Sequence, residues 1–264
     1  MPEALDLYCD SHIHTRLCGH ATGEMEEYVQ SAIAKGLRKI IFLEHMEEGI
    51  LCHSDTWLSE DAFDYYFSEG RRLQDLYGRQ LEIGLGVECG FNADRAGTLR
   101  TRLKRRQWDC IGVSCHFLKL PGMREHLNLF SRKEENTRLA RQFQPEMLLD
   151  LYFRTLHEAV RQLPGTMLCH LDGALRFVPE TTLTEAHYRL IEQLLQTVSK
   201  KGMALELNTS GITIRREPFP TGRILSLALA YNIPLILGSD AHRPADVARH
   251  FADICRFIPS ESCP

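Results

Sequence analysis

The sequence predicts an α/β fold in which seven parallel strands, each followed by a helical segment, close into a barrel. Apolar runs of strand length alternate with segments of helical period along nearly all of the 264 residues, a pattern typical of βαβ units around a parallel sheet. Histidine and carboxylate side chains stand where several predicted strands end. Barrel enzymes collect their active-site residues at this end of the strands, whereas an open doubly wound sheet uses a single crevice.

The predicted strands are short apolar runs bounded by polar or turn residues. They cover residues 5–9, 39–43, 81–87, 110–114, 167–169, 203–207 and 235–238. The helices expected between them have helical periodicity, and Gly36, Gly78 and Gly202 follow three of them as stop signals. These helices cover residues 24–35, 61–77, 93–105, 145–162, 184–201, 222–231 and 244–256.

Residues 117–145 are polar and weakly periodic, and we expect them to form a long loop over the mouth of the barrel. Loops of that length usually have a function. No repeat, low-complexity tract or linker divides the chain, so residues 1–264 are predicted to form one domain.

Composition narrows the possible classes of protein. Hydrophobic residues at 44% and charged residues at 25% are ordinary for a soluble globular protein, and a formal charge of −4 gives no electrostatic reason to expect a nucleic-acid partner. No apolar run approaches the ~20 residues of a membrane span, and the N-terminus lacks the cationic start of a signal peptide. Nine cysteines without a CxxC pair disfavour a disulfide framework, so we expect a cytoplasmic protein.

The first candidate motif is Asp10-Ser-His12-Ile-His14, which His20 follows in the next loop. Side chains at positions i and i+2 of an extended segment project to the same side, so His12 and His14 can bind one ion. Asp10 shares this parity and is expected to orient an imidazole from behind.

The same placement recurs at Glu44-His45, Glu88, His116, His170 and Asp240-Ala-His242, each close to the end of a predicted strand. Imidazole and carboxylate ligands without clustered thiols suit zinc, manganese or iron. A carboxylate such as Glu88 can bridge two ions. The set therefore predicts a multinuclear metallohydrolase. The other histidines fall in predicted loops or helices, and we expect them on the surface or in helix packing: His53, His126, His157, His187 and His250.

Together these motifs and the final GSDAH resemble the polymerase and histidinol phosphatase (PHP) superfamily, and most of all its histidinol-phosphate phosphatases. The resemblance implies a distorted seven-stranded (β/α)7 TIM-like barrel with three divalent ions, of zinc, manganese or iron. It assigns His12, His14, Glu88 and Asp240 to the first ion, Glu88, His116 and His170 to the second, and His20, His45 and His242 to the third.

Such ions lower the pKa of a bound water and clamp phosphoryl oxygens, so the expected reaction is attack of a metal-bridging hydroxide on phosphorus. Glu88, Asp240 and His242 are the expected catalytic groups of the centre. A phosphate dianion also needs guanidinium contacts. Arg176, Arg215 and Arg216 are similar in placement to the phosphate-contacting residues of that branch. Asp240 or Glu44 could be the general acid, and the sequence does not choose between them.

The predicted activity is hydrolysis of L-histidinol phosphate to L-histidinol and phosphate. Residues 46–49 and 89–91 depart from the pattern of that branch, which leaves the leaving group open. One alternative is a PHP phosphoesterase acting on nucleotides or other small phosphate esters. Others are a non-catalytic metal-binding barrel, disfavoured by the intact ligand set, and an amidohydrolase, disfavoured because no lysine stands at a strand end. The native metal and the oligomeric state stay open.

Overall fold

The computed structural model describes residues 5–52, 55–177, 182–220, 222–259 and 263. Its main sheet has seven strands, all paired in parallel, in the order β1-β2-β3-β4-β7-β8-β9. The strands are β1 (Cys9–Ile13), β2 (Lys39–Met46), β3 (Glu82–Gly90), β4 (Ile111–Ser114), β7 (Met167–Leu168), β8 (Ala204–Asn208) and β9 (Leu235–Gly238).

The two ends of this sheet meet and close it into a barrel. Ile13 forms a parallel bridge with Ala241. The His14 N–H donates to the Ala241 carbonyl at 2.9 Å, and the Ala241 N–H donates to the His12 carbonyl at 3.3 Å. The predicted seven-stranded α/β barrel is therefore confirmed.

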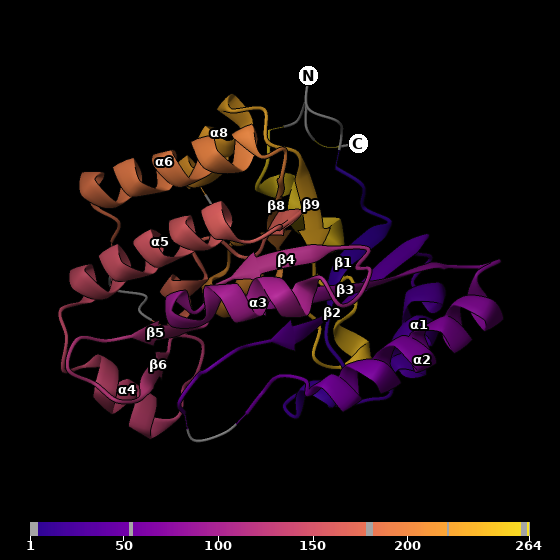
Figure 1. Cartoon of the computed structure of the whole chain (residues 1–264). Coiled ribbons are helices and arrows are strands. Elements are labelled where there is room, and N and C mark those ends of the chain that lie inside the picture. Colours follow the sequence, from indigo (N-terminus) through magenta and orange to yellow (C-terminus); the bar gives the residue numbers. More distant parts are fainter. Residues whose placement is uncertain (1–4, 53–54, 178–181, 221, 260–262, 264) are drawn as a thin grey trace.

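Helices surround the strands (Figure 1). They are α1 (Met25–Ala34), α2 (Glu60–Tyr77), α3 (Ala96–Leu103), α5 (Pro145–Gln162), α6 (Glu185–Lys200) and α8 (Gly222–Ala230). Because these helices cover the outer face and side chains fill the inside, strands such as β2 are buried on both faces. Within the described residues no helix is long and apolar enough to cross a membrane.

The strands that carry candidate ligands extend further than the sequence predicts. β1 begins at Cys9, where the predicted strand ends, so His12 lies inside the strand and not beyond it. β2 and β3 continue to Met46 and Gly90 and include Glu44, His45 and Glu88. Charged side chains usually indicate the end of a buried strand. Here neighbouring polar groups pair with them, so the backbone hydrogen bonds between the strands continue past these residues.

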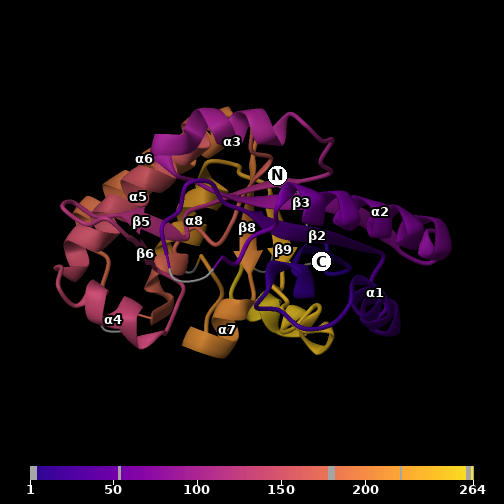
Figure 2. The ribbon, with the colours of Figure 1, turned by 60° about the horizontal axis from the view of Figure 1, so that its bottom comes forward.

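The predicted loop at residues 117–145 is wrong. β5 (Phe117–Lys119) and β6 (His126–Asn128) form an antiparallel hairpin, and α4 (Glu134–Ala140) follows it. These elements lie together on the side of the molecule away from α1 and α2 (Figures 1 and 2). Strands of three residues are too short to show a period that can be recognised in the sequence.

The last predicted helix, residues 244–256, is also wrong. Two 3₁₀ turns, Pro244–Asp246 and Phe251–Arg256, replace it, because Ala248 and His250 have φ values of 50° and 60°, outside the right-handed helical region. A short helix that was not predicted, α7 (Ser210–Arg215), follows β8. Cys255 and Cys263 form the disulfide found within the described residues, which is a single local link and not a framework.

Tyr66 fastens α2 to the barrel wall. Its fully buried side chain places the hydroxyl 3.0 Å from the Phe42 carbonyl of β2 and 3.0 Å from the Gly86 carbonyl of β3. The hydroxyl therefore links the helix to two neighbouring strands that carry candidate ligands further along.

Replacing Tyr66 with phenylalanine is expected to lower the free energy of unfolding by about 1 kcal/mol, because a buried hydrogen bond is lost without a change of shape. Urea denaturation followed by circular dichroism measures this. Tyr65→Phe is the matched control, since Tyr65 is 48% exposed on the same helix. Equal midpoints for the two variants would contradict the anchoring role of the Tyr66 hydroxyl.

Candidate metal centre

Glu88 is the centre of the cluster at the C-terminal end of the strands. Its side chain is 1% exposed, and its two oxygens face different groups of histidines. Oε1 lies 2.9 Å from His116 Nε2 and 2.8 Å from His170 Nε2. Oε2 lies 3.0 Å from His45 Nδ1 and 3.4 Å from His12 Nε2. This geometry is that of a carboxylate shared between two ligand sets.

The residues expected to hold the first ion come together around Glu88 Oε2. His12 Nε2 and His14 Nε2 are 2.9 Å apart. His14 Nε2 lies 3.5 Å from Asp240 Oδ1 and 3.5 Å from Glu88 Oε2. Ligand atoms around a tetrahedral ion with bonds of about 2.1 Å are roughly 3.4 Å from one another. The spacing of these donors therefore suits a divalent ion.

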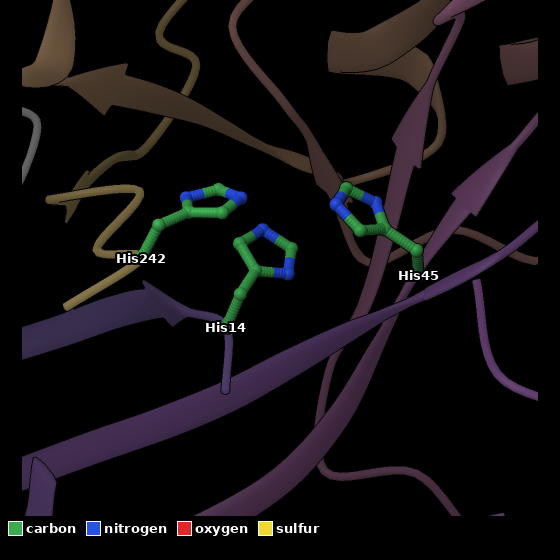
Figure 3. A group of neighbouring side chains, drawn as sticks. All are labelled: His14, His45 and His242. Atoms are coloured by element: carbon green, nitrogen blue, oxygen red, sulfur yellow. The ribbon is translucent and has the colours of Figure 1, made fainter. Parts of the chain in front are cut away.

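The third expected set lies beside the first, with His14 between them. His14, His45 and His242 offer nitrogen atoms within 4.8 Å of one another. Figure 3 shows their rings converging from β1, β2 and the segment after β9. His20 Nε2 is 2.9 Å from His242 Nε2. The expected set of His20, His45 and His242 is thus brought together, and the His14 ring packs on His45 at 4.1 Å.

Two carboxylates that the sequence reasoning missed orient the imidazoles. Glu206 Oε1 lies 2.7 Å from His12 Nδ1, while its Oε2 accepts from the His170 backbone N–H at 2.7 Å. Glu47 Oε1 lies 2.8 Å from His116 Nδ1. A carboxylate that takes the Nδ1 proton directs the Nε2 lone pair towards a metal. The sequence does contain a signal that Glu206 is functional, because it is a lone acidic residue inside the apolar strand β8.

The polar atoms of this cluster are unsatisfied without cations. With His12 and His116 protonated at Nδ1, their Nε2 lone pairs face the Glu88 carboxylate. Glu88 Oε2 is buried and has no hydrogen-bond partner among the described residues. Buried acceptors that face one another are costly unless a positive charge lies between them. The donor set of imidazoles and carboxylates therefore fits divalent ions such as zinc, manganese or iron.

The electrostatics favour the ligand form of His14, His242 and Glu88. Burial lowers the pKa of His14 well below its ordinary value, with help from His45 and His242, and burial lowers the pKa of His242 to about 4. Burial alone would raise the pKa of Glu88, but His116 and His12 outweigh it and hold that pKa well below the usual range. Neutral imidazoles and an ionised carboxylate are the forms that bind metal. Against burial, nearby carboxylates raise the pKa of His12 well above its ordinary value and that of His116 to about 10, so a cation bound there would displace a proton from each of these two rings.

Glu44 and Asp10 lie behind the cluster. Glu44 Oε1 accepts from the Thr15 N–H at 2.8 Å and the Thr15 hydroxyl at 2.6 Å, and burial raises the pKa of Glu44 to about 8. Its other oxygen is 3.9 Å from His14 Nδ1, on the far side of that ring from Nε2. Asp10 accepts from the backbone N–H groups of Ser239 and Ala248. The expectation that Asp10 orients an imidazole is wrong, because its carboxylate joins β1 to the segment after β9.

Of the three predicted arginines, Arg176 adjoins the cluster. Its Nη2 donates to Asp240 Oδ2 and to Ser210 Oγ, at 3.0 Å each. Its guanidinium lies 5.3 Å from the Phe130 ring and 5.5 Å from the Phe219 ring. Arg215 and Arg216 do not contact the metal-ligand cluster as Arg176 does. Arg215 donates to the Leu175 carbonyl and lies 3.5 Å from Glu217, while the side chain of Arg216 is exposed at the end of α7.

A cavity of about 550 Å³ opens beside His20, His45 and His116. Its other wall is the segment with β5, β6 and α4, so this segment does cover the mouth, as predicted. The lining includes two basic and three acidic residues, namely Arg132, Lys133, Asp55, Glu125 and Glu135. A cavity of this size suits a small ligand.

One of the histidines expected away from the site lines this cavity. His126 is 6% exposed and belongs to β6, so its assignment to the surface or to helix packing is wrong. The assignment to helix packing is confirmed for His187, which caps α6, and for His157, which lies 2.8 Å from Thr197 on α6. His53 lies outside the described residues.

The sequence matches the PHP domain family over residues 10–210. The chain belongs to the PHP domain family. It is 28% identical to a Deinococcus radiodurans protein named "Probable histidinol-phosphatase" over 256 residues, which cover 95% of this chain and 92% of that protein.

Two solved structures share the fold. One from Listeria monocytogenes has a TM-score of 0.84 and 21% identity, with 94% of this chain and 100% of that chain covered. The other is histidinol phosphate phosphatase from Lactococcus lactis, in complex with zinc, L-histidinol and phosphate. It has a TM-score of 0.77 and 20% identity, with 96% of this chain and 94% of that chain covered.

Glu88→Gln is expected to release metal, because an amide carries no charge and one of its two terminal atoms cannot bind a cation. Metal per chain, measured by plasma mass spectrometry after dialysis, should fall, while circular dichroism should show a folded protein. Glu82→Gln on the exposed end of the same strand is the control and should keep its metal. Unchanged metal content in Glu88→Gln would rule out the shared carboxylate.

Glu206→Gln is expected to weaken metal binding by about 10- to 100-fold, the usual effect of losing a carboxylate that orients a ligand histidine. Competition with a chelating dye measures the affinity. Glu185→Gln, on the exposed start of α6, should bind metal like the parent protein. If Glu206→Gln and the control have the same affinity, then Glu206 does not orient His12.

Proposed function

We propose that this PHP-domain protein is a metal-dependent phosphomonoesterase that hydrolyses L-histidinol phosphate to L-histidinol and phosphate. We further propose that it uses three divalent ions of zinc, manganese or iron, held by the three residue sets predicted from the sequence. The observation that carries the proposal is the shared carboxylate of Glu88, with histidine nitrogens on both sides and Arg176 nearby. The named relatives support the choice of substrate.

The roles of the residues follow from their contacts. Divalent ions bound there lower the pKa of a water molecule and neutralise the charge on phosphoryl oxygens. Arg176 adds a guanidinium whose Nη2 is fixed by Asp240 and Ser210, and whose Nε is buried without a hydrogen-bond partner among the described residues. A fixed guanidinium suits recognition of a phosphate dianion. We assign Arg176 to phosphate binding, whereas Arg215 and Arg216 stay predictions.

Asp240 is poorly suited to donate a proton. Burial would raise its pKa, but His12 and Arg176 outweigh burial and hold that pKa well below the ordinary value. Oδ1 faces the histidines of the first set, while Oδ2 accepts from Arg176. We therefore assign Asp240 as a metal ligand, and not as the general acid.

The charges around the cavity suit a substrate that carries both signs. The basic residues Arg132 and Lys133 and the acidic residues Asp55, Glu125 and Glu135 line the same space. L-histidinol phosphate combines a phosphate dianion with an ammonium group, so each sign has a complement in the lining. The proposed partner is thus a small phosphorylated metabolite, and the proposed location is the cytoplasm.

The deciding experiment is phosphate release from L-histidinol phosphate by protein loaded with manganese or zinc. We expect kcat/KM of about 10⁴ M⁻¹s⁻¹ or above, the usual range for an enzyme with its own substrate. A chelator should abolish turnover, and returning the metal should restore it. Phenyl phosphate and a nucleoside monophosphate run beside it as comparisons. Preference for the nucleotide, or no metal-dependent release from L-histidinol phosphate, would contradict the proposal.

A further inference from the structure

His126 presents a buried N–H group that the metal centre does not use. Its Nδ1 accepts from the Leu51 backbone N–H at 3.1 Å, and its own backbone N–H donates to the Leu51 carbonyl at 2.8 Å. Since Nδ1 is an acceptor, the proton of the neutral ring is on Nε2. Burial and the nearby Lys119 lower the pKa of His126, which favours the neutral ring.

The Nε2–H of this ring has no partner within the described part of the chain. Leaving a buried donor unpaired is unfavourable, so a partner from a ligand would stabilise the site. The residue lines the cavity that opens beside His20, His45 and His116. His126 is thus the kind of group that binding sites use to select a ligand.

The hairpin places His126 away from the reacting phosphate. Phe117 pairs with Asn128 and Lys119 pairs with His126, so these four positions share one face of the hairpin. Phe117, His126 and Asn128 all line the cavity, whereas Leu118 and Leu127 are buried on the other face. The paired position, Lys119, is three residues beyond the candidate ligand His116, or about 10 Å of extended chain.

This separation indicates what His126 contacts. Asn128 of β6 pairs with Phe117, next to His116, whereas His126 lies at the other end of β6. A phosphate group beside Glu88 and Arg176 would therefore lie away from the His126 ring. The part of the substrate nearest His126 would be the distal end of the alcohol that leaves. A ring attached through a short carbon chain spans such a distance better than a ring attached directly to the ester oxygen.

We propose that His126 is a specificity-determining residue whose Nε2–H donates a hydrogen bond to an uncharged acceptor at the distal end of the leaving group. The preferred substrates are then phosphate esters of short-chain alcohols that end in a ring with an acceptor nitrogen. This inference rests on the proposed phosphatase function and deepens it, because the imidazole of L-histidinol has such a nitrogen.

Two variants separate the roles of the two ring nitrogens. In His126→Asn, the side-chain oxygen takes the place of Nδ1 and can still accept from the Leu51 N–H, but nothing replaces Nε2. In His126→Gln, the amide nitrogen reaches the place of Nε2 and can still donate. The substrates are L-histidinol phosphate and L-phenylalaninol phosphate, which has the same chain and a ring without nitrogen.

With L-histidinol phosphate, His126→Asn should lower kcat/KM by about 10-fold, the equivalent of one hydrogen bond, mainly through a higher KM. With L-phenylalaninol phosphate the same variant should stay within a factor of about two of the parent, and the metal content should not change. His126→Gln should keep more of the preference for L-histidinol phosphate. Equal losses on both substrates would show a structural role, and no loss on either would show that His126 contacts neither. Both results overturn the inference.

Binding of L-histidinol and L-phenylalaninol to the metal-loaded protein, measured by calorimetry, gives a second readout that needs no turnover. His126→Asn should weaken the binding of L-histidinol and leave that of L-phenylalaninol unchanged. If His126→Asn loses the selective binding of L-histidinol but the parent protein does not hydrolyse L-histidinol phosphate, the proposed function fails, while the hydrogen bond from His126 to the ring of L-histidinol stands. If the parent protein and His126→Asn bind L-histidinol equally, the inference fails whatever the activity.

Discussion

The buried charge of Glu88 is the constraint on which the rest of the structure depends. A carboxylate that is 1% exposed loses nearly all hydration, and such a group is stable only when positive charge or donors surround it. Histidines from several strands supply the surroundings, and each must present a defined nitrogen. Glu47 and Glu206 fix that choice by contacting the opposite nitrogen of His116 and His12. At the C-terminal end of the strands, Glu88 thus contacts histidines, and two of these histidines in turn contact Glu47 and Glu206.

The contacts that close the barrel also bring candidate metal ligands together. The bonds that join β1 to the segment after β9 run between the backbones of His12, His14 and Ala241. They bring Asp240 against the two histidines, and Asp10 ties the segment down through Ser239 and Ala248. Asp240 has a φ of 50°, a conformation that costs energy outside glycine and that is concentrated at functional sites. The backbone hydrogen bonds that close the barrel hold Asp240 in this conformation.

Sequence reasoning found the elements whose signals are local. α5 begins at Pro145 as predicted, because proline suits the first turn and a strong helical period follows. The histidines near strand ends were found because each follows an apolar run of strand length in the sequence. The hairpin at residues 117–128 was missed because its strands are three residues long. The partners of His12 and His116 were missed because Glu206 is 194 residues away and Glu47 is 69 residues away in the chain, and only the fold brings them together.

The two orienting carboxylates also explain glycines in the barrel strands. A Cβ atom at Gly90, on β3, would collide with the Glu47 carboxylate, and one at Gly238, on β9, would collide with the Glu206 carboxylate. Glu47 therefore fills the space that a side chain at position 90 would need, and Glu206 fills the space that a side chain at position 238 would need. Glu47 and Gly90 meet behind His116, and their close fit holds the Glu47 carboxylate against Nδ1 of that ring, 2.8 Å away.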